Sequence, residues 1–528
     1  MSKNTSIFIF HRSLRLDDNR GLIEALRVSK VLPIFIFSPD QITDNAFRSV
    51  PAIRFMISAL MDLDAHLRRH GSKMRFYYGQ PDAVLNSVLR DPKLTKLGIS
   101  SVYLNKDYTP YAKQREADLQ TICDANDVEL HSIEDYLLLP INSVTNVSGS
   151  YYSVFTPFYN NAVKHKVDKP VPNKKSNYVS KTAIVGKMKY EIELSAILPK
   201  IKFKGGLSKV GLPNYKSTRA EGLKRIELIK NHRLYEKNRN NIAMSNSTTL
   251  LSPYIKFGIV SVREVYHRIL SLFGRKHTLI SQLFWREFYY NIAYNRPDVL
   301  KGKSFRPSYD KIRWKRSAIL LKKWKTGTTG VPIVDAAMRE LVQSNFMHNR
   351  GRLITSNYLV KHYLIDWKEG EKFFAQHLVD YDPAVNNGNW QWSAGSGADA
   401  QPYFRQMNPW AQGKKYDPDC LYIKKWIPEL QDVPAQDIHN WQNTHAMHDV
   451  DYPKPYLTYD FAKLTKASKS IYSTAKYKAK SKTKSKSKSK SKSKSKTKSE
   501  SKTKSKNKRK TKSKSKSKNK SRRKTRNA

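Results

Sequence analysis

The chain has 528 residues, which is too long for one ordinary domain and allows two or three. Its net charge is +53, and about half of that charge lies in residues 476–528, which contain 27 Lys and Arg and a single acidic residue, Glu500. The rest of the chain is also strongly basic, which favours nucleic acid as a partner. The alternative is that lysines are simply spread over the protein surface. The two cysteines lie far apart and no 18 apolar residues run together, so we expect no disulfide framework, no metal site and no membrane contact, and we predict a soluble intracellular protein.

The first 135 residues alternate short apolar runs with a helical pattern. Apolar or aromatic runs predict strands at 7–10, 31–37 and 74–78, and helical spacing of apolar residues predicts a helix over 52–67. This alternation is typical of an α/β domain with a doubly wound parallel sheet. Such a sheet offers a ligand crevice at the carboxyl ends of its strands.

A change of composition follows. Residues 136–205 mix Asn, Ser, Gly, Pro and Lys, which predicts a long connector between domains, held down by the aromatic side chains of 152–158. From 206 to 465 the pattern becomes helical and predicts a large all-α domain, with helices over 220–230, 262–273 and 280–294.

The last segment, 466–528, repeats Lys-Ser and Lys-Thr pairs almost without apolar residues from about Lys476. Such a segment cannot bury a core, so we expect disorder. Its charge would strengthen binding to DNA phosphates without reading sequence. An import signal around Arg522 and a mere solubilising role are the alternatives.

Two polar stretches in the helical part suggest a ligand. In 248–254, hydroxyl side chains precede a proline that opens a helix, an arrangement that binds phosphate, although a simple N-cap explains it too. The stretch 380–392 holds two carboxylates, adjacent amides, a glycine and two tryptophans. Its carboxylates and amides can hydrogen-bond a flavin, and Gly388 would admit a flat ring. The alternative is an Asx-rich loop followed by a half-buried aromatic strand or helix.

Several ordered blocks resemble the photolyase/cryptochrome family, closest to class I cyclobutane pyrimidine dimer photolyases. The resemblance covers about residues 5–455 and is carried by 285–288, 330–339, 347–352, 366–370 and 380–392. It implies an antenna-binding α/β domain over 1–135, a connector over 136–205 and a helical domain over 206–465 that binds FAD and DNA. Residues 10–19 are similar to the family's opening motif, with His11 where arginine is more usual. In the family the sheet crevice often holds a second chromophore; a folate, a deazaflavin and an empty pocket all stay open.

The resemblance implies a set of FAD contacts. Asn386 would face the redox nitrogen, where a neutral amide does not oppose an anionic reduced ring. Arg352 would pair with a nearby carboxylate or with a flavin oxygen. Leu250 departs from the family, where arginine is common. The full set is Tyr235, Thr248, Thr249, Leu250, Leu251, Ser252, Asn349, Arg352, Asp380, Tyr381, Asp382 and Asn386.

In the family, light excites fully reduced FAD, an electron passes to the dimer, the ring opens and the electron returns. The resemblance implies that Trp390, Trp367 and Trp314 carry electrons from solvent to the flavin; each alone is more simply a packing aromatic. Trp285 and Trp392 would form the walls on which a flipped dimer rests. The implied DNA contacts, otherwise solvated polar surface, are Arg239, Gln282, Trp285, Arg286, Asn349, Arg350, Trp392 and Gln412.

Two positions disturb the assignment. Gln282 stands where dimer photolyases usually have a glutamate that stabilises the dimer radical, and Leu353 replaces a frequent methionine. An amide can still donate to thymine carbonyls, so we expect impaired or altered repair before abolished repair. Glutamine there is also familiar from (6-4) photolyases and animal cryptochromes, but His348-Asn349-Arg350 lacks their paired histidines.

The hypothesis from the sequence is therefore a light-driven cyclobutane pyrimidine dimer photolyase that acts on UV-damaged DNA as a monomer. A (6-4) photolyase, a cryptochrome-type blue-light photoreceptor signalling through its tail, and a flavoprotein that binds DNA without catalysis are the alternatives. The basic tail would place the protein in a nucleus or nucleoid if it acts in targeting or DNA tethering.

Overall fold

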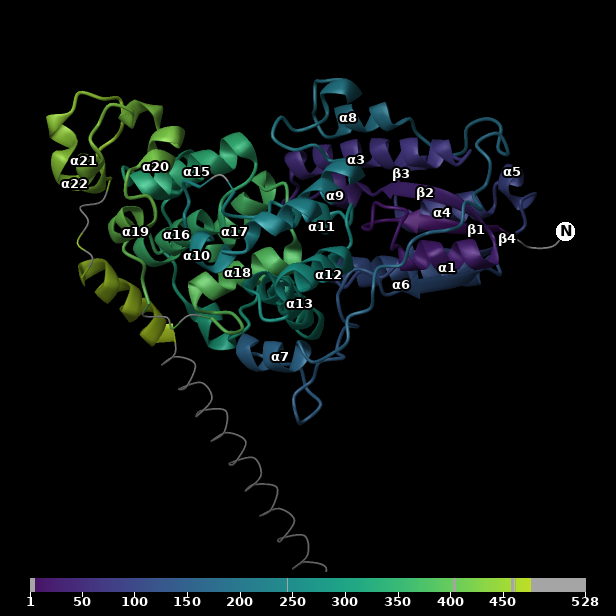
Figure 1. Cartoon of the computed structure of the whole chain (residues 1–528), viewed down its shortest axis with the longest axis horizontal. Coiled ribbons are helices and arrows are strands. Elements are labelled where there is room, and N and C mark those ends of the chain that lie inside the picture. Colours follow the sequence, from purple (N-terminus) through teal and green to yellow (C-terminus); the bar gives the residue numbers. More distant parts are fainter. Residues whose placement is uncertain are drawn as a thin grey trace, which may run out of the picture. The chain divides into compact units, whose positions relative to one another are not determined.

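The computed structural model describes residues 5–244, 246–400, 402, 405–456, 460 and 462–475, and Figure 1 labels most of their helices and strands. The chain divides into two compact units, Met1–Arg306 with Trp314–Lys469 and Pro307–Arg313 with Ser470–Ala528. Within the second unit, the rings of Tyr309 and Tyr472 lie 5.5 Å apart. Among the residues described, none of the helices combines the length and apolar character needed to cross a bilayer.

The N-terminal part of the main unit is built on a five-stranded sheet in the order β3-β2-β1-β4-β5. All strand pairs are parallel. The predicted α/β class is confirmed, and the three apolar runs form the first three strands. The strands are β1 (Thr5–Phe10), β2 (Lys30–Phe37), β3 (Arg75–Tyr78), β4 (Ile99–Asn105) and β5 (Glu129–Ile133).

Helices cover both faces of this sheet. Along β1 the side chains alternate: Phe8 and Phe10 belong to a buried cluster with residues of α1 and α3, whereas Ile7 and Ile9 belong to one with residues of α4 and α6. Burial on both faces explains why the strands read as nearly continuous apolar runs. The helices are α1 (Arg20–Val28), α2 (Pro39–Ile42), α3 (Val50–Arg69), α4 (Pro81–Leu89), α5 (Pro92–Thr95) and α6 (Pro110–Asp124).

The strand order reverses between β1 and β4. At such a switch point the loops after the two strands diverge and leave a crevice. Arg12 follows β1 and Asp107 follows β4, and their side chains form an ion pair of 3.3 Å. The expected crevice is therefore spanned by a charged pair.

The segment 136–205 is ordered along its length and carries secondary structure of its own. It contains α7 (Phe155–Ala162), the 3₁₀ turn η1 (Leu194–Ala196) and α8 (Ile197–Lys200). Isolated bridges join it to the sheet, from Tyr178 to β2 and from Glu191 to β3. Phe155 and Phe158 are buried, as expected of the aromatic side chains that hold the segment down.

The remainder is helical, as predicted. The helix α12 has the predicted bounds 262–273, whereas the one predicted over 220–230 ends as an α-helix at Glu227 and continues as a 3₁₀ turn. The helices are α9 (Arg219–Glu227), α10 (Tyr235–Asn238), α11 (Ser252–Lys256), α12 (Val262–Phe273), α13 (Thr278–Asn295), α14 (Ala318–Thr326), α15 (Pro332–Ser344), α16 (Asn349–Asn357), α17 (Trp367–His377), α18 (Pro383–Ala394), α19 (Pro409–Tyr416), α20 (Leu421–Trp426), α21 (Ala435–His439) and α22 (Trp441–Thr444). Short turns are η2 (Leu207–Lys209), η3 (Leu228–His232), η4 (Pro297–Lys301), η5 (Pro307–Lys311), η7 (Pro428–Leu430) and η8 (His445–Met447), with a π-helical turn, η6 (Tyr358–His362).

Helical structure also occupies 462–475, so our expectation of disorder from 466 was wrong for its first ten residues. The reason is visible in the sequence, because Leu464, Tyr472 and Ala475 recur at helical spacing before the Lys-Ser repeats begin. The rest of the predicted disordered tail, 476–528, lies outside the described residues.

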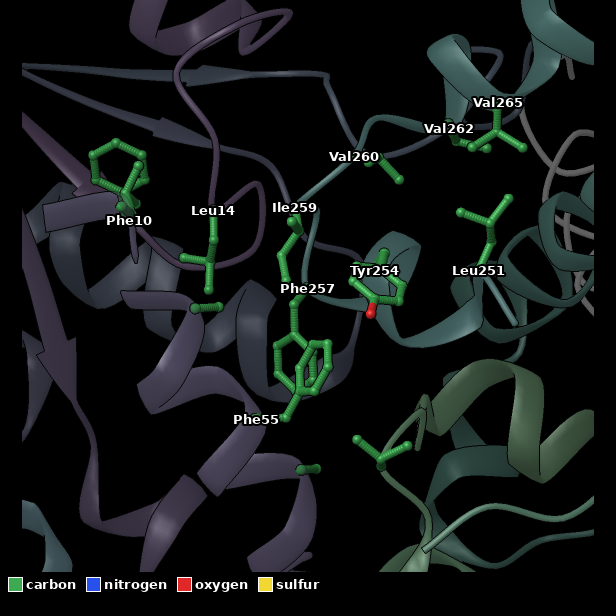
Figure 2. Packing of buried hydrophobic residues seen from close by; sticks show 14 of the residues in the cluster. Phe10, Leu14, Phe55, Leu251, Tyr254, Phe257, Ile259, Val260, Val262 and Val265 are labelled. Atoms are coloured by element: carbon green, nitrogen blue, oxygen red, sulfur yellow. The ribbon is translucent and has the colours of Figure 1, made fainter. Parts of the chain in front are cut away.

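One hydrophobic core joins the α/β part to the helical part. The Phe55 ring on α3 lies 5.6 Å from the Tyr254 ring of α11 and 5.5 Å from the Phe257 ring just after it. Figure 2 shows these rings together with Phe10 of β1. The sheet and the helices around α11 therefore share their packing.

A buried ionic network reinforces this junction. The Asp135 carboxylate pairs with Arg15 at 2.8 Å and with Arg263 of α12 at 2.7 Å, and all three side chains are almost fully buried. Gly258 allows the close approach, since it has a φ of +62° and a Cβ there would lie 2.3 Å from the Ser13 nitrogen. The helices that follow Gly258 are thereby fixed to the loop after β1.

Candidate active site

A cavity of about 490 Å³ opens in the helical part. Its wall is built mainly by α10, α11, α13, α16 and α18 and by the turn before α11, with side chains of α12 and α17 and Tyr136 completing it. The wall includes every residue predicted to contact FAD, namely Tyr235, Thr248, Thr249, Leu250, Leu251, Ser252, Asn349, Arg352, Asp380, Tyr381, Asp382 and Asn386. It also includes Trp390 and the predicted DNA residues Arg239, Gln282, Trp285, Arg286 and Trp392, with Leu353 beside them. Segments far apart in the sequence therefore converge on one site.

Asp380 is clamped at one side of this cavity. Arg352 Nη2 lies 3.1 and 3.0 Å from the two Asp380 oxygens, so the expected pairing of this arginine with a carboxylate is confirmed. The Ser252 hydroxyl donates to Asp380 Oδ2 at 2.7 Å. This hydroxyl therefore helps to orient the Asp380 carboxylate, and its predicted part in binding a phosphate stays a prediction.

The backbone before α11 is strained. Leu250 has a φ of +52°, in the left-handed region that large side chains rarely adopt. Strain of this kind costs on the order of 1–3 kcal/mol and clusters at functional sites. Since Leu250 is part of the cavity wall, its backbone conformation shapes the site.

Asp382 begins helix α18 and is bound from several directions. Its Oδ1 accepts the Ala384 and Val385 N–H groups at 3.1 and 3.2 Å, which makes it the N-cap of the helix. Its Oδ2 accepts the Tyr290 and Tyr136 hydroxyls at 2.5 and 3.2 Å. The carboxylate is therefore committed to protein groups, and it orients the helix that carries Asn386 and Trp390.

The charge of Asp382 is held by its neighbours. Burial alone would raise its pKa, but the positive charges of Arg12 and Lys256, with the Tyr290 hydrogen bond, hold the pKa of Asp382 at about 2. Arg12 lies 3.5 Å from Asp382 Oδ2 and also pairs with Asp107, so it links the loops after β1 and β4 to the cavity wall. The sequence analysis did not place Arg12, Tyr136 or Tyr290 beside Asp382, because each meets Asp382 only through the tertiary fold.

Two further charged groups line the cavity. Burial, followed by the charge of Arg12, lowers the pKa of the Lys256 amine to about 8. The Arg286 guanidinium donates to Glu287 Oε1 and to the Tyr136 carbonyl, both at 2.9 Å, and lies 4.0 Å above the Tyr136 ring. Those donors of Arg286 are already engaged, so only its remaining donors are free for the predicted contact with DNA.

Gly388 does not have the role that its position suggested. It lies outside the cavity wall formed by the described residues, and the flat ring against it belongs to Tyr289 of α13. A Cβ on Gly388 would lie 2.1 Å from Tyr289 Cδ1. The glycine therefore permits close packing of α18 on α13 rather than approach of a ligand.

The three predicted electron-carrying tryptophans share one hydrophobic cluster. Trp390 and Trp367 are buried in it, and Trp314 is partly buried and packs against it. The Trp390 ring rests on α17, the helix that Trp367 begins, at Gly370. Only Trp390 reaches the cavity wall. The sequence analysis missed Trp324, whose ring centroid lies 6.1 Å from that of Trp390.

Two predicted DNA residues lie away from the cavity wall that the described residues form. Arg350 donates to Asn240 and lies 4.2 Å above the Tyr416 ring. Gln412 is on α19. The structure therefore gathers the predicted FAD contacts at one site, and most but not all of the predicted DNA contacts.

The comparisons with known proteins agree with this architecture. A family model for the FAD binding domain of DNA photolyase matches residues 279–473, and the DNA photolyase model matches residues 6–175. The deoxyribodipyrimidine photo-lyase of Halobacterium salinarum is 32% identical over 476 residues, covering 85% of this chain and 95% of that protein. The protein of the same name from Escherichia coli is 30% identical over 472 residues, covering 87% and 97%.

Solved structures are similar over most of their length. An archaeal photolyase from Sulfolobus tokodaii with two FAD molecules matches with a TM-score of 0.76 at 35% identity, over 89% of this chain and all of that one. A class III photolyase from Agrobacterium tumefaciens matches with a TM-score of 0.78 at 28% identity, over 90% and 98%. A Synechocystis cryptochrome at 23% identity, with a TM-score of 0.76 over 89% and 99%, shows the fold alone.

The sheet, the helical part and its polar cavity define a flavoprotein of the photolyase and cryptochrome fold, with FAD as its cofactor. More particularly, its relatives at 30% identity or above, matched over nearly their whole length, show that the chain belongs to the DNA photolyase family.

Proposed function

We propose that this protein is a light-driven DNA repair enzyme that splits cyclobutane pyrimidine dimers in UV-damaged DNA. The observation that carries the proposal is that one cavity gathers all the predicted FAD contacts and the tryptophans Trp285 and Trp392 in a member of the DNA photolyase family. When bound, FAD supplies the photoexcited electron donor. The residues of the chain bind, orient and shield the reacting groups.

The cavity fits a large, polar, anionic dinucleotide. Arg352 and Asp380 provide a charged pair with fixed geometry, and Asn386 Nδ2 is anchored to the Glu371 carbonyl at 3.2 Å, which fixes the orientation of its amide in the wall. Lys256 and Arg286 bring positive charge to the same wall, which favours an anionic ligand. In our proposal Asp382 acts as the N-cap of α18 and thereby holds Asn386 in place in the wall.

The mouth of the cavity suits a base taken out of the DNA stack. Photolyases are among the enzymes known to flip their target base, and a lesion that already distorts the duplex lowers the cost of flipping. Trp285 and Trp392 supply aromatic surface, and Gln282 supplies an amide that can donate to a pyrimidine carbonyl. We propose that Arg239, Asn349, Arg350 and Gln412 contact the flanking DNA.

We further propose that Trp390, Trp367 and Trp314 carry electrons from solvent to the cavity. Their membership of one hydrophobic cluster supports this relay, with Trp390 at the wall, Trp367 buried and Trp314 partly buried. Indole is a side chain that oxidises readily, which suits a relay.

The crevice between β1 and β4 is our proposed place for a second chromophore of the folate or deazaflavin type. The Sulfolobus tokodaii photolyase, described with two FAD molecules and an implied light-harvesting cofactor, offers a precedent in a relative. An absorbance band not due to FAD in the purified protein would support a second chromophore, and a spectrum of FAD alone would contradict it.

We also propose that the protein acts as a monomer.

The repeats of 476–528 would condense on DNA phosphates and, where they act in targeting, direct the chain to a nucleus or nucleoid. We also propose that the domains divide near residues 135 and 205. Removal of 476–528 should weaken binding to any DNA and reduce its dependence on salt.

The deciding experiment is repair of dimer-containing oligonucleotides by the purified, photoreduced protein under blue light. Dimers should disappear in light and persist in the dark, and unchanged dimers in both would contradict the proposal. A (6-4) substrate is tested beside the dimer, because Gln282 lines the cavity where dimer photolyases have glutamate. Gln282→Glu should raise dimer repair; preferential repair of the (6-4) substrate by the wild type would favour that alternative.

A further inference from the structure

The ring of Trp285 is stacked on a residue of the connector segment. Phe155 of α7 lies with its ring centroid 3.7 Å from that of Trp285, and the two planes differ by 9°. On Phe155 in turn lies Tyr159, at 5.6 Å and 15°. Three nearly parallel rings therefore run from α7 to α13, and the last of them, Trp285, belongs to the cavity wall.

Phe155 is itself held in place. Phe288 of α13 meets the edges of both stacked rings, at 5.9 Å and 82° from Phe155 and at 5.7 Å and 89° from Trp285. Phe158, one turn along α7, packs on Phe288 at 5.5 Å. Side chains in such close packing have little freedom to change rotamer. The helix α7 therefore holds the Phe155 ring in a fixed position against the Trp285 indole.

We propose that Phe155 is a positioning residue for Trp285, and that α7 is thereby part of the wall that receives a flipped pyrimidine. The inference rests on the proposed function, in which Trp285 stacks on the lesion. Phe155 covers one face of the Trp285 indole, and this stacking fixes the orientation of the indole ring in the cavity wall. An indole fixed before binding loses less conformational freedom when a base stacks on it, so the stack should improve affinity for a flipped base.

This role makes a prediction that simple packing does not. If Phe155 only fills space, its truncation lowers the stability of the protein and leaves the preference for damaged DNA unchanged. If it orients Trp285, truncation weakens binding to dimer-containing DNA in particular. Contacts of Arg and Lys with phosphates do not depend on the indole plane, so binding to undamaged DNA should stay the same.

The test compares Phe155→Leu with the control Phe158→Leu. Both replace a buried phenylalanine of α7 that packs on Phe288, but only Phe155 stacks on Trp285. Affinities for dimer-containing and undamaged oligonucleotides of the same sequence are measured in the dark at one salt concentration. FAD content and urea midpoints are measured beside them. Phe155→Tyr keeps the flat ring and serves as the conservative variant.

We expect Phe155→Leu to weaken binding to damaged DNA by about fivefold, the range of one aromatic pair, with binding to undamaged DNA and FAD content unchanged. Phe158→Leu leaves the ring stacked on Trp285 in place and should lose less of the preference than Phe155→Leu, and Phe155→Tyr should keep the wild-type preference. In repair assays the loss should appear in KM more than in kcat. Full preference for damaged DNA in Phe155→Leu, or an equal loss in Phe158→Leu, would overturn the inference.

Failure of the proposed function is recognised separately. Wild-type protein that leaves dimers unchanged in light contradicts the proposed repair activity. Because binding is measured in the dark, the ratio of the two affinities still decides the role of Phe155 in that case. Wild-type protein with no preference for damaged DNA would overturn the inference itself.

Discussion

Replacement of Gly370 by alanine tests how closely the cavity wall depends on the packing of α17. A Cβ on Gly370 would lie 2.1 Å from Trp390 Cη2, 2.5 Å from Trp390 Cζ3 and 2.7 Å from Leu359 Cδ2. Ordinary contacts of a Cβ begin near 3.4 Å, so the indole must move by more than 1 Å. Trp390 is buried in a dense cluster, which leaves it little room to do so.

The magnitude follows from two opposing effects. In a helix interior, alanine is ordinarily more stable than glycine by about 1 kcal/mol. Insertion of a methyl group into a packed core costs about 1–3 kcal/mol, and the contact with an indole ring lies at the upper end of that range. We therefore expect Gly370→Ala to lower the free energy of unfolding by about 1–2 kcal/mol, the opposite sign from a usual Gly→Ala change in a helix.

Urea unfolding gives the stability, and the rate of light-driven FAD reduction gives the functional effect, which should be slower because Trp390 is displaced. Gly206→Ala is the control, since its φ is −76° and a Cβ there meets nothing within 4 Å. Equal or greater stability of Gly370→Ala, with unchanged photoreduction, would show that the wall does not depend on this contact.

Three further predictions follow from the charged groups. Arg352→Lys should weaken FAD binding about tenfold, since lysine lacks the planar fork that meets Asp380; fluorescence titration measures this, and unchanged affinity would contradict it. Asp135→Asn removes the carboxylate that pairs with the buried Arg15 and leaves Arg263 with only the Asp18 carboxylate, so it should lower the free energy of unfolding by about 3–5 kcal/mol in urea; a loss below about 1 kcal/mol would mean that the network contributes little. Burial and nearby arginines lower the pKa of His348 from 6.5 to about 4, so the folded state binds fewer protons than the unfolded state between these values and stability should fall as pH drops through them. His348→Asn should flatten that part of the pH profile, and an unchanged slope would contradict the assignment.

The periodicity of the sequence was sufficient to predict the local elements. The apolar runs at 7–10, 31–37 and 74–78 became strands and the spacing over 262–273 became α12, because burial on one or both faces imposes a period that can be read locally. The fold class followed from their alternation. The boundary of the predicted disordered tail was wrong, because a helix occupies 462–475 and its few apolar residues directly precede a strongly basic repeat.

The cavity residues were predicted from motif resemblance, and the structure shows them in one place. The motifs did not predict which neighbour each of these residues contacts. The resemblance did not indicate that Ser252 donates to Asp380, and Gly388 was expected at a ligand ring but lies against Tyr289. A residue type and its spacing limit the chemistry that a side chain can perform. They do not say which neighbour it meets, because that partner comes from another helix.

Asp382 shows why this distinction matters for function. As the N-cap of α18 it sets where the helix begins, and through Arg12 and Tyr290 it is tied to the loop after β1 and to α13. A shift of any of these elements changes the register of Asn386 and Trp390 along the cavity wall, since both lie on α18. The α/β part therefore contributes to the geometry of the FAD site even though most of the wall comes from the helical part.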